Sequence, residues 1–341
     1  MQKLKGVLLV NLGTPDSPST KDVRVYLAEF LNDPLVIGIP PALRRLLVHG
    51  IILRTRPAKS AKAYQEIWTD RGSPLLFHGV DLAERVKGEL GDEVAAVELA
   101  MRYRNPSVQS KLEEMQARGV DDLIVVPLFP QYSQAAWASA VKEVFDAAAR
   151  MANMPNLQVV EPYYEAPHFL DATVEVARPV LDEFQPDHVL LSFHGVPDNH
   201  CTDRDTSGSH CQKSDNCCDQ IVAQNRFCYR AQCFATARGL QSRLGLDASN
   251  SEVAFQSRLT KDWIRPFTDE RVVALAKQGV KRLAVLCPSF VADCLETIEE
   301  IGMRAAEDFV EAGGEALQLV PCVNAEVPWA KGLAAMVREN L

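Results

Sequence analysis

The chain has 341 residues, of which 47% are hydrophobic and 24% are charged, and its formal net charge is -9. This length and composition allow one large or two packed hydrophobic cores and exclude extensive disorder. The acidic balance argues against nucleic-acid binding, which depends on Lys and Arg at the phosphates, and suits a cationic ligand better. The sequence contains no run of the roughly 18 to 20 apolar residues that a membrane-spanning helix needs.

The first residues run directly into an apolar stretch at 7–10 that is too short for the core of a signal peptide. We therefore expect a cytoplasmic protein. Because that compartment does not sustain structural disulfides, the nine cysteines are expected to be reduced thiols or metal ligands.

Short apolar runs rich in β-branched residues alternate with helical segments along the chain, which predicts an α/β fold with mainly parallel strands. Helices are predicted at 139–151 and 295–310, where Ala, Glu and Leu recur at helical spacing and Gly313 ends the second helix. The strands are predicted at residues 7–12, 94–101, 123–128, 157–160, 188–193, 253–255, 283–286 and 317–320.

Two pairs of segments suggest an internal repeat. Residues 8–16 parallel 190–198 in a strand followed by Gly-x-Pro-Asp, and residues 119–126 parallel 279–286. Two similar doubly wound lobes are the simplest explanation, with boundaries at 1–165 and 166–341, and chance similarity among apolar strands is the alternative. The first alignment places His194 opposite Leu12, so only the second lobe carries a polar group at this position.

Ligands of α/β sheets bind at the carboxyl ends of the strands. His194 directly follows the predicted strand 188–193. Glu296 follows the predicted strand 283–286 and its loop, close to the start of the next helix. Glu300 would share a helix face with Glu296, and Asp293 would extend this acidic row by one turn. An imidazole beside carboxylates can relay protons or guide a hard cation. The alternative is an acidic helix start stabilised by the helix dipole, with the histidine hydrogen-bonded inside a turn.

Six segments, in order and at matching spacing, resemble ferrochelatase: residues 9–15, 102–103, 129–133, 192–195, 255–258 and 293–297. The Ser-Phe-His-Gly and Asp-Cys-Leu-Glu-Thr segments are the most specific, and the resemblance extends over roughly residues 6–340. It implies two similar Rossmann-like lobes, each a parallel four-stranded sheet flanked by helices, around a porphyrin cleft. It also implies a lyase that inserts ferrous iron into protoporphyrin IX, giving protohaem and two protons in the terminal step of haem biosynthesis.

The resemblance also implies roles for individual residues. His194 would accept the pyrrole protons, while Glu296 and Glu300 would pass protons out or guide the substrate iron in. Trp263 could equally be a core residue. The positions that match the lining or rim of the porphyrin pocket are Arg102, Tyr103, Phe129, Tyr132, Ser133 and Trp263.

Residues 30–56 combine dense apolar side chains with Arg44, Arg45, Arg54 and Arg56. They could form a lip at the porphyrin mouth that also makes peripheral contact with the inner face of the cytoplasmic membrane. The arginines could then bind the porphyrin propionates through paired hydrogen bonds. A buried helix whose arginines reach out to solvent is the alternative.

Six of the nine cysteines lie within 33 positions, in a segment at about 200–235. This segment resembles the internal cysteine-rich insertion through which some bacterial ferrochelatases bind a [2Fe-2S] cluster. The resemblance suggests four ligands among Cys211, Cys217, Cys218, Cys228 and Cys233. Cys201 is expected to be spare, and the adjacent pair is expected to supply one ligand. Zinc is the alternative occupant, because four thiolates also suit that ion.

Two other functions remain open. A cobalt or nickel chelatase for another tetrapyrrole would use the same imidazole and carboxylate chemistry. A non-catalytic porphyrin or haem carrier would not need an acidic relay beside the base, so the pairing of His194 with Glu296 argues against it.

Overall fold

The computed structural model describes residues 4–341. It divides into two compact units, the first comprising residues 4–129, 134–161 and 333–341 and the second residues 130–133 and 162–332. The sequence suggested a single boundary after residue 165, whereas the chain passes between the units several times. No helix within residues 4–341 is long and apolar enough to cross a membrane.

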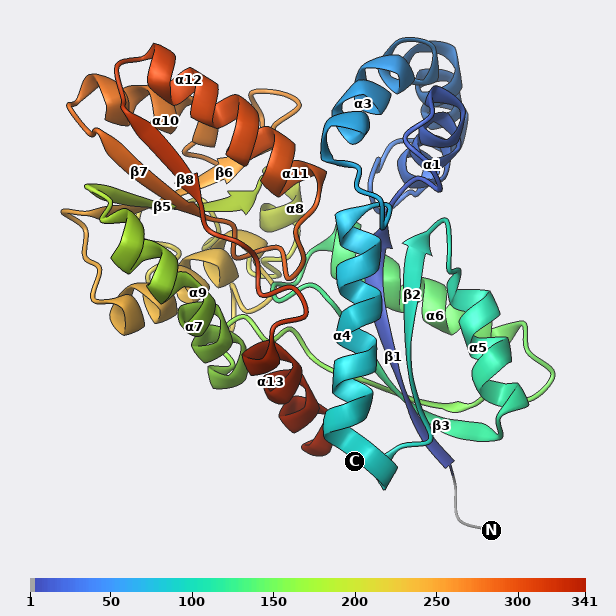
Figure 1. The fold of residues 1–341 in the computed structure, drawn as a ribbon. Helices are drawn as coiled ribbons and strands as arrows, with labels where there is room; N and C mark the ends of the chain where they lie inside the picture. Colours follow the sequence, from blue (N-terminus) through green and yellow to red (C-terminus); the bar gives the residue numbers. More distant parts are fainter. Residues whose placement is uncertain (1–3) are drawn as a thin grey trace. The chain divides into compact units, whose positions relative to one another are not determined.

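The first unit is built on a parallel sheet with strand order β2-β1-β3-β4. Its elements are β1 (Leu4–Gly13), α1 (Thr20–Asn32), α2 (Pro41–Leu47), η1 (Val48–Ile52), α3 (Leu53–Ile67), α4 (Pro74–Leu90), η2 (Gly91–Glu93), β2 (Ala96–Tyr103), α5 (Val108–Ala117), β3 (Val120–Pro127), η3 (Gln134–Ala138), α6 (Ser139–Ala149) and β4 (Asn156–Val159). Apolar residues of the sheet pack against α5 and α6 to form one core. The helix α4 contacts β1 and β2 (Figure 1).

The second unit has a parallel sheet with strand order β6-β5-β7-β8. Its elements are α7 (Pro167–Phe184), β5 (His188–His194), α8 (Asn199–Thr202), α9 (Tyr229–Leu244), β6 (Ser251–Gln256), α10 (Thr268–Lys277), β7 (Arg282–Leu286), α11 (Leu295–Thr297), η4 (Ile298–Ala305), α12 (Ala306–Glu311) and β8 (Ala316–Leu319), and α13 (Val327–Arg338) runs from this unit into the first. Figure 1 shows α10 and α12 on one face of this sheet and α7 and α9 on the other. A core of sheet residues packed against η4, α10 and α12 fills the first of these faces.

The strand pairing confirms the predicted repeat. In the first sheet Leu9 of β1 is paired with Val126 of β3, and in the second sheet Leu191 of β5 is paired with Leu286 of β7. These are the pairs that the two sequence alignments place in equivalent positions, and the two strand orders match element for element. The predicted α/β fold with two similar parallel four-stranded sheets is therefore confirmed.

The helix predicted at 295–310 is not a continuous α-helix. It consists of a single α-helical turn, α11, then the π-helix η4, and finally α12. A π-helix closes its hydrogen bonds from residue i to i+5 and is rare outside functional sites. The acidic residues of the sequence motif lie where the α-helical turn passes into this wider turn.

Candidate active site

The candidate site of the second unit lies at the carboxyl ends of three neighbouring strands. His194 is the last residue of β5 and is paired in register with Gln256, the last residue of β6. On the other side of β5, the loop after β7 brings Phe290 near the imidazole, with 6.1 Å between ring centroids. Trp263 flanks the same imidazole at 6.4 Å. The position that the sequence suggested for His194 is therefore the one at which α/β sheets bind their ligands.

A hydrogen bond of the His194 ring fixes the tautomer of its neutral form. Its Nδ1 lies 2.6 Å from the carbonyl oxygen of Gly195. Because a carbonyl can only accept, Nδ1 must carry the proton, and the neutral ring then has a free lone pair on Nε2. Gly195 is held in turn by donating its N–H to the Gln256 carbonyl at 2.7 Å. A Cβ at Gly195 would lie 2.8 Å from that oxygen, so the close approach requires glycine.

Gln256 connects the two halves of the site, and the sequence analysis did not single it out. Its buried side-chain amide accepts from Ser192 Oγ at 2.8 Å and donates from Nε2 to the backbone carbonyl of Glu296 at 2.7 Å. Its backbone carbonyl supports Gly195. One residue therefore holds both the turn behind His194 and the backbone of Glu296.

Glu300 is anchored to the first residue after β6. Both of its carboxylate oxygens accept from Ser257, one from the N–H at 2.8 Å and one from Oγ at 2.6 Å. Ser257 has φ +63°, a left-handed conformation that costs a residue with a side chain about 1–2 kcal/mol. Such strain is typical of functional sites.

Burial raises the pKa of Glu300 above its ordinary value, against the opposing effects of the Ser257 hydrogen bonds and the nearby His194. The neighbouring charge of Glu296 raises it further. Gln256 and Ser257 at the end of β6 thus hold the backbone of Glu296 and the carboxylate of Glu300 beside the strand that ends at His194.

Asp293 does not continue this acidic row. Its buried carboxylate accepts from Thr297 Oγ1 at 2.9 Å, from Asn324 Nδ2 at 2.7 Å and from the N–H of Cys322. The sequence analysis placed Asp293 on the helix, but Cys294 is the extended cap with φ -150°, so the helix begins after it. Asp293 holds the loop that follows β8, and the acidic pair of the site is Glu296 and Glu300.

Arg102 and Tyr103, predicted from the resemblance as substrate contacts, lie at the end of β2 in the first unit. Arg102 Nη2 lies 2.7 Å from Asp33 Oδ2, and the Tyr103 hydroxyl donates to the same oxygen at 2.9 Å. Burial disfavours ionised Asp33, but hydrogen bonds from Ser139, Leu35 N–H and Tyr103 lower its pKa overall. The polar atoms of Arg102 and Tyr103 are thus engaged within the protein, by Asp33, Ser139 and Glu143, and Asp33 was not singled out from the sequence.

The other predicted contacts are divided between the units. Phe129 is partly buried against the core of the first sheet. Tyr132 and Ser133 belong to the second unit, where the N–H of Tyr132 donates to Gln232 Oε1 and Ser133 is buried. Trp263 is partly exposed beside His194. Among these residues, Trp263 is the one that the structure brings to the imidazole.

Residues 30–56 expose several large apolar side chains. The helix α2 buries none of its residues, and its Leu43 and Leu46 are exposed together with Ile51 of η1. Arg44 is partly engaged, since its Nη1 donates to two backbone carbonyls of the preceding turn, whereas Arg45 is exposed. The alternative of a buried helix therefore does not describe α2.

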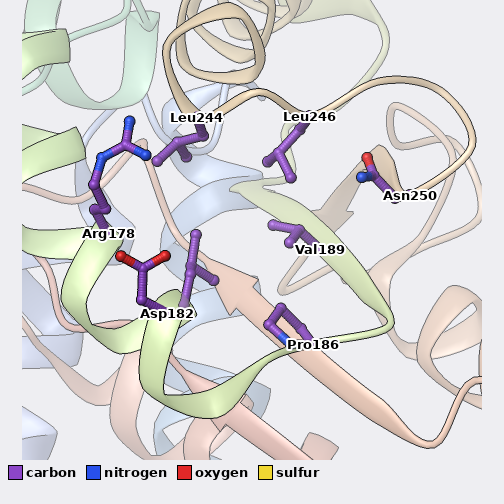
Figure 2. A pocket seen from close by; sticks show the side chains of 8 residues that line it. Arg178, Asp182, Pro186, Val189, Leu244, Leu246 and Asn250 are labelled. Atoms are coloured by element: carbon purple, nitrogen blue, oxygen red, sulfur yellow. The ribbon is translucent and has the colours of Figure 1, made fainter.

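A hollow of about 160 Å³ lies at the opposite end of β5 from His194 (Figure 2). It is bordered by Val189, the second residue of β5, by Leu244 and Leu246 after α9, and by Arg178 and Asp182 of α7. Ligand pockets are typically about 300–1,000 Å³ and lie at the carboxyl ends of the strands. This hollow matches neither property and is separate from the candidate site.

All six thiols of the cysteine-rich segment are buried and none forms a disulfide. Cys228 is central to the electrostatics of the group, since the thiols of Cys201 and Cys218 influence its raised pKa and Cys228 in turn influences the pKa of Cys211. The sulfur of Cys217 lies 3.7 Å from that of Cys218. These two residues lie in turns rather than in an extended chain, so their side chains converge instead of diverging.

Two further features of this segment bear on metal binding. The thiol of Cys233 interacts with the Tyr229 hydroxyl, while Cys201, expected to be spare, contacts Cys228. In residues 4–341, no group of three or more His, Cys, Asp or Glu side chains is arranged to hold a metal ion.

Comparison with known proteins bears on the whole chain. The family model described as Ferrochelatase matches residues 4–341. A ferrochelatase of Coxiella burnetii (strain Dugway 5J108-111) is 45% identical over 98% of this chain and 94% of its own length. A ferrochelatase of Pseudomonas fluorescens (strain SBW25) is 47% identical over 96% of this chain and 95% of its own length. Among solved structures, SirB from Bacillus subtilis with Fe3+ has a TM-score of 0.57 at 14% identity, covering 98% of this chain and 95% of that chain, which supports the fold alone.

Proposed function

The chain belongs to the ferrochelatase family, and we propose that it metallates protoporphyrin IX with His194 as the proton acceptor beside Glu296 and Glu300. Family membership gives the reaction class, which is insertion of Fe2+ into a porphyrin in haem synthesis, catalysed by a lyase. The best support for His194 as the proton acceptor is the free lone pair on its Nε2. The carboxyl group of Glu300, whose pKa is raised, lies near this imidazole.

The reaction replaces two pyrrole protons by one Fe2+ ion, so the site must remove protons while a cation arrives. The Nε2 lone pair of His194 accepts a proton from a pyrrole N–H, and the ring becomes an imidazolium. The nearby carboxylates of Glu296 and Glu300 stabilise this cation and supply the acceptors to which the proton passes next. Binding energy from the rest of the macrocycle can supply the strain that turns a pyrrole nitrogen toward the base.

The porphyrin specificity is tested by anaerobic metallation with ferrous iron. We expect a higher kcat/KM with protoporphyrin IX than with coproporphyrin, because apolar side chains are exposed on residues 30–56 and protoporphyrin has fewer carboxylates. Cobalt and nickel are supplied in parallel to test the alternative chelatases. Preference for coproporphyrin would reject the proposed substrate, and the absence of metallation with any of the metals would leave the carrier alternative.

We also propose peripheral contact of residues 30–56 with an anionic membrane. Exposed Leu43, Leu46 and Ile51 could enter the interfacial region while Arg45 remains at the headgroups. The double variant Leu43→Ser/Leu46→Ser should bind less to vesicles containing phosphatidylglycerol, measured by co-sedimentation. Leu259→Ser, an exposed leucine outside this region, is the matched control. Equal binding of both variants and the unmodified protein would contradict the proposal.

The cysteine-rich segment is proposed to hold a [2Fe-2S] cluster. Two thiolates bound to one tetrahedral metal ion lie about 3.8 Å apart, by the ordinary metal–sulfur length, and Cys217 and Cys218 are at 3.7 Å. The segment therefore offers thiols of the right kind and in sufficient number for a thiolate-bound cluster. The neighbours of Cys228 favour Cys201, Cys218 and Cys228 as ligands, and the 3.7 Å pair favours Cys217 as the fourth, with Cys211 as the alternative to it. A bound cluster would cross-link a segment that has little regular structure.

This proposal predicts a coloured protein after anaerobic purification, with an iron-to-sulfide ratio near one. Cys228→Ser and Cys201→Ser should lose the visible absorption, whereas Cys233→Ser should retain it, because the Cys233 thiol is engaged by Tyr229. Colourless protein containing zinc would support the alternative occupant. Loss of colour in Cys233→Ser but not in Cys201→Ser would restore the ligand set suggested by the sequence.

A further inference from the structure

We infer that Asp33 is a positioning residue for the proposed porphyrin lip, because it fastens the start of residues 34–52 to the first unit. Arg102 and Tyr103 then influence porphyrin binding through Asp33 and not by contact with the ring. This role rests on the proposed function of residues 30–56, and it deepens that function by naming what holds these residues in place.

Asp33 lies where α1 ends and the outer part of the lip begins. It is the C-cap of α1, and its extended backbone, with φ -66° and ψ 123°, stops the helix. Its carbonyl oxygen accepts from the N–H of Val36 at 3.1 Å and from the N–H of Ile37 at 3.0 Å. Its Oδ1 accepts from the N–H of Leu35 at 2.7 Å. One residue therefore shapes the turn with which the segment starts.

The second carboxylate oxygen of Asp33 ties this turn to the rest of the unit. Oδ2 accepts from Arg102 Nη2 at 2.7 Å and from the Tyr103 hydroxyl at 2.9 Å, and also from Ser139 Oγ. Arg102 and Tyr103 end β2, and Ser139 begins α6. Asp33, Tyr103 and Ser139 are buried, so water does not compete for these charge-assisted hydrogen bonds. One carboxylate thus joins the turn to a strand and a helix.

The donors of Arg102 and Tyr103 are engaged by these contacts. Arg102 Nε donates to Ser139 Oγ at 2.7 Å, and its Nη1 lies 3.4 Å from Glu143 Oε2. The Arg102 guanidinium also lies over the Tyr103 ring, 4.5 Å from its centroid. A porphyrin propionate could take either donor only by displacing Asp33. Removing one partner of a buried ion pair is strongly unfavourable, so the two side chains are assigned to Asp33.

The segment beyond Asp33 depends on its two ends for its direction. The helix α2 buries none of its residues, so packing contributes little to fixing it. At the far end, Arg24 Nη1 donates to the carbonyl of Leu53. Asp33 fastens the near end. If only a fraction of molecules holds a binding segment in the competent arrangement, the apparent affinity falls by that fraction.

The test compares Asp33→Asn with Asp81→Asn in the full-length protein. Asp33→Asn should raise the KM for protoporphyrin IX about 10-fold in anaerobic iron insertion and change kcat by less than about 2-fold, because the lip binds the ring but does not react. Asp81→Asn is the matched control, since Asp81 of α4 accepts two hydrogen bonds from Arg71, at 2.6 Å and 2.8 Å, in the same unit. It should leave the KM unchanged.

Tyr103→Phe is a milder variant, which keeps the inference testable if Asp33→Asn does not fold. It removes one donor to Asp33 but retains the ring beside Arg102 and Phe30. Without porphyrin, the amides at 35–37 should exchange about 10-fold faster or more in both variants, the effect of losing one hydrogen bond to a charged group, and not in Asp81→Asn. The combined variant Asp33→Asn/Tyr103→Phe should raise the KM by less than the product of the single effects.

The exchange measurement needs neither porphyrin nor turnover, so it separates this inference from the proposed function. Unchanged exchange in both variants would overturn the anchoring role of Asp33, whether or not the protein metallates porphyrin. Faster exchange with an unchanged KM would overturn the positioning role and the proposed lip function of residues 30–56. A raised KM in Tyr103→Phe with unchanged exchange would show direct contact of Tyr103 with the porphyrin and reject the route through Asp33.

Discussion

Replacement of His194 by alanine is expected to lower kcat for iron insertion by about 10²–10⁴-fold, the usual contribution of a positioned general base. The reason is that Nε2 of His194 carries the free lone pair at the carboxyl end of β5, while Nδ1 is engaged by the Gly195 carbonyl. The KM for porphyrin should change much less, because the lost interaction is made mainly in the transition state. Rates are measured anaerobically by the loss of free-porphyrin fluorescence.

His188→Gln is the matched control for this prediction. His188 starts the same strand, six residues before the partly exposed His194, and is itself buried, with no hydrogen-bond partner at Nε2. It should therefore retain near-normal turnover. If both variants were equally slow, the loss would reflect damage to β5 and not the removal of a base. Normal turnover of His194→Ala would reject the proposed mechanism.

Glu300→Gln is expected to make the protein less active but more stable at neutral pH. Activity should fall by about 10²-fold or more, because the amide cannot take up the proton that leaves His194. Stability should rise because burial raises the pKa of Glu300, so ionising this carboxyl in the folded state costs free energy. The packing around residue 300 should be unchanged, because glutamine has nearly the same shape as glutamate.

The sign of the pH dependence follows from linkage. A carboxyl whose folded pKa is raised favours folding fully below its ordinary pKa of 4.5 and loses that contribution as pH rises through the folded value. The stability difference between Glu300→Gln and the unmodified protein should therefore grow from pH 4 upward, measured by urea unfolding. Glu307→Gln, on the exposed part of α12, should show no such trend. A Glu300→Gln variant that was less stable at pH 8 than at pH 4, relative to the unmodified protein, would contradict the assignment.

The sheets could be predicted because strands of parallel sheets are buried on both faces and appear as continuous apolar runs. All eight predicted strands are present, and the repeat alignment correctly placed Leu12 and His194 at equivalent strand ends. The position of His194 at the carboxyl end of β5 also agrees with the sequence, which placed it directly after a strand.

The details around these residues could not be predicted from local patterns. The sequence does not reveal that Cys294 is an extended cap before the helix, so Asp293 was wrongly placed on the same face as Glu296. Ser257 adopts a left-handed conformation for which serine has no strong preference, and this geometry brings its N–H and hydroxyl to Glu300. The role of Gln256 depends on contacts with two separate segments, the end of β5 and the backbone of Glu296, which only the folded chain reveals.

Chemical rescue of His194→Ala by added imidazoles tests the central claim, that this residue accepts the pyrrole proton, most directly. A base that diffuses into the space left by the imidazole should restore iron insertion in proportion to its concentration. The rescued rate should increase with the pKa of the added base, as expected for proton transfer in the transition state. Rescue that did not depend on the pKa of the base, or no rescue by imidazoles small enough to enter the space, would contradict the account.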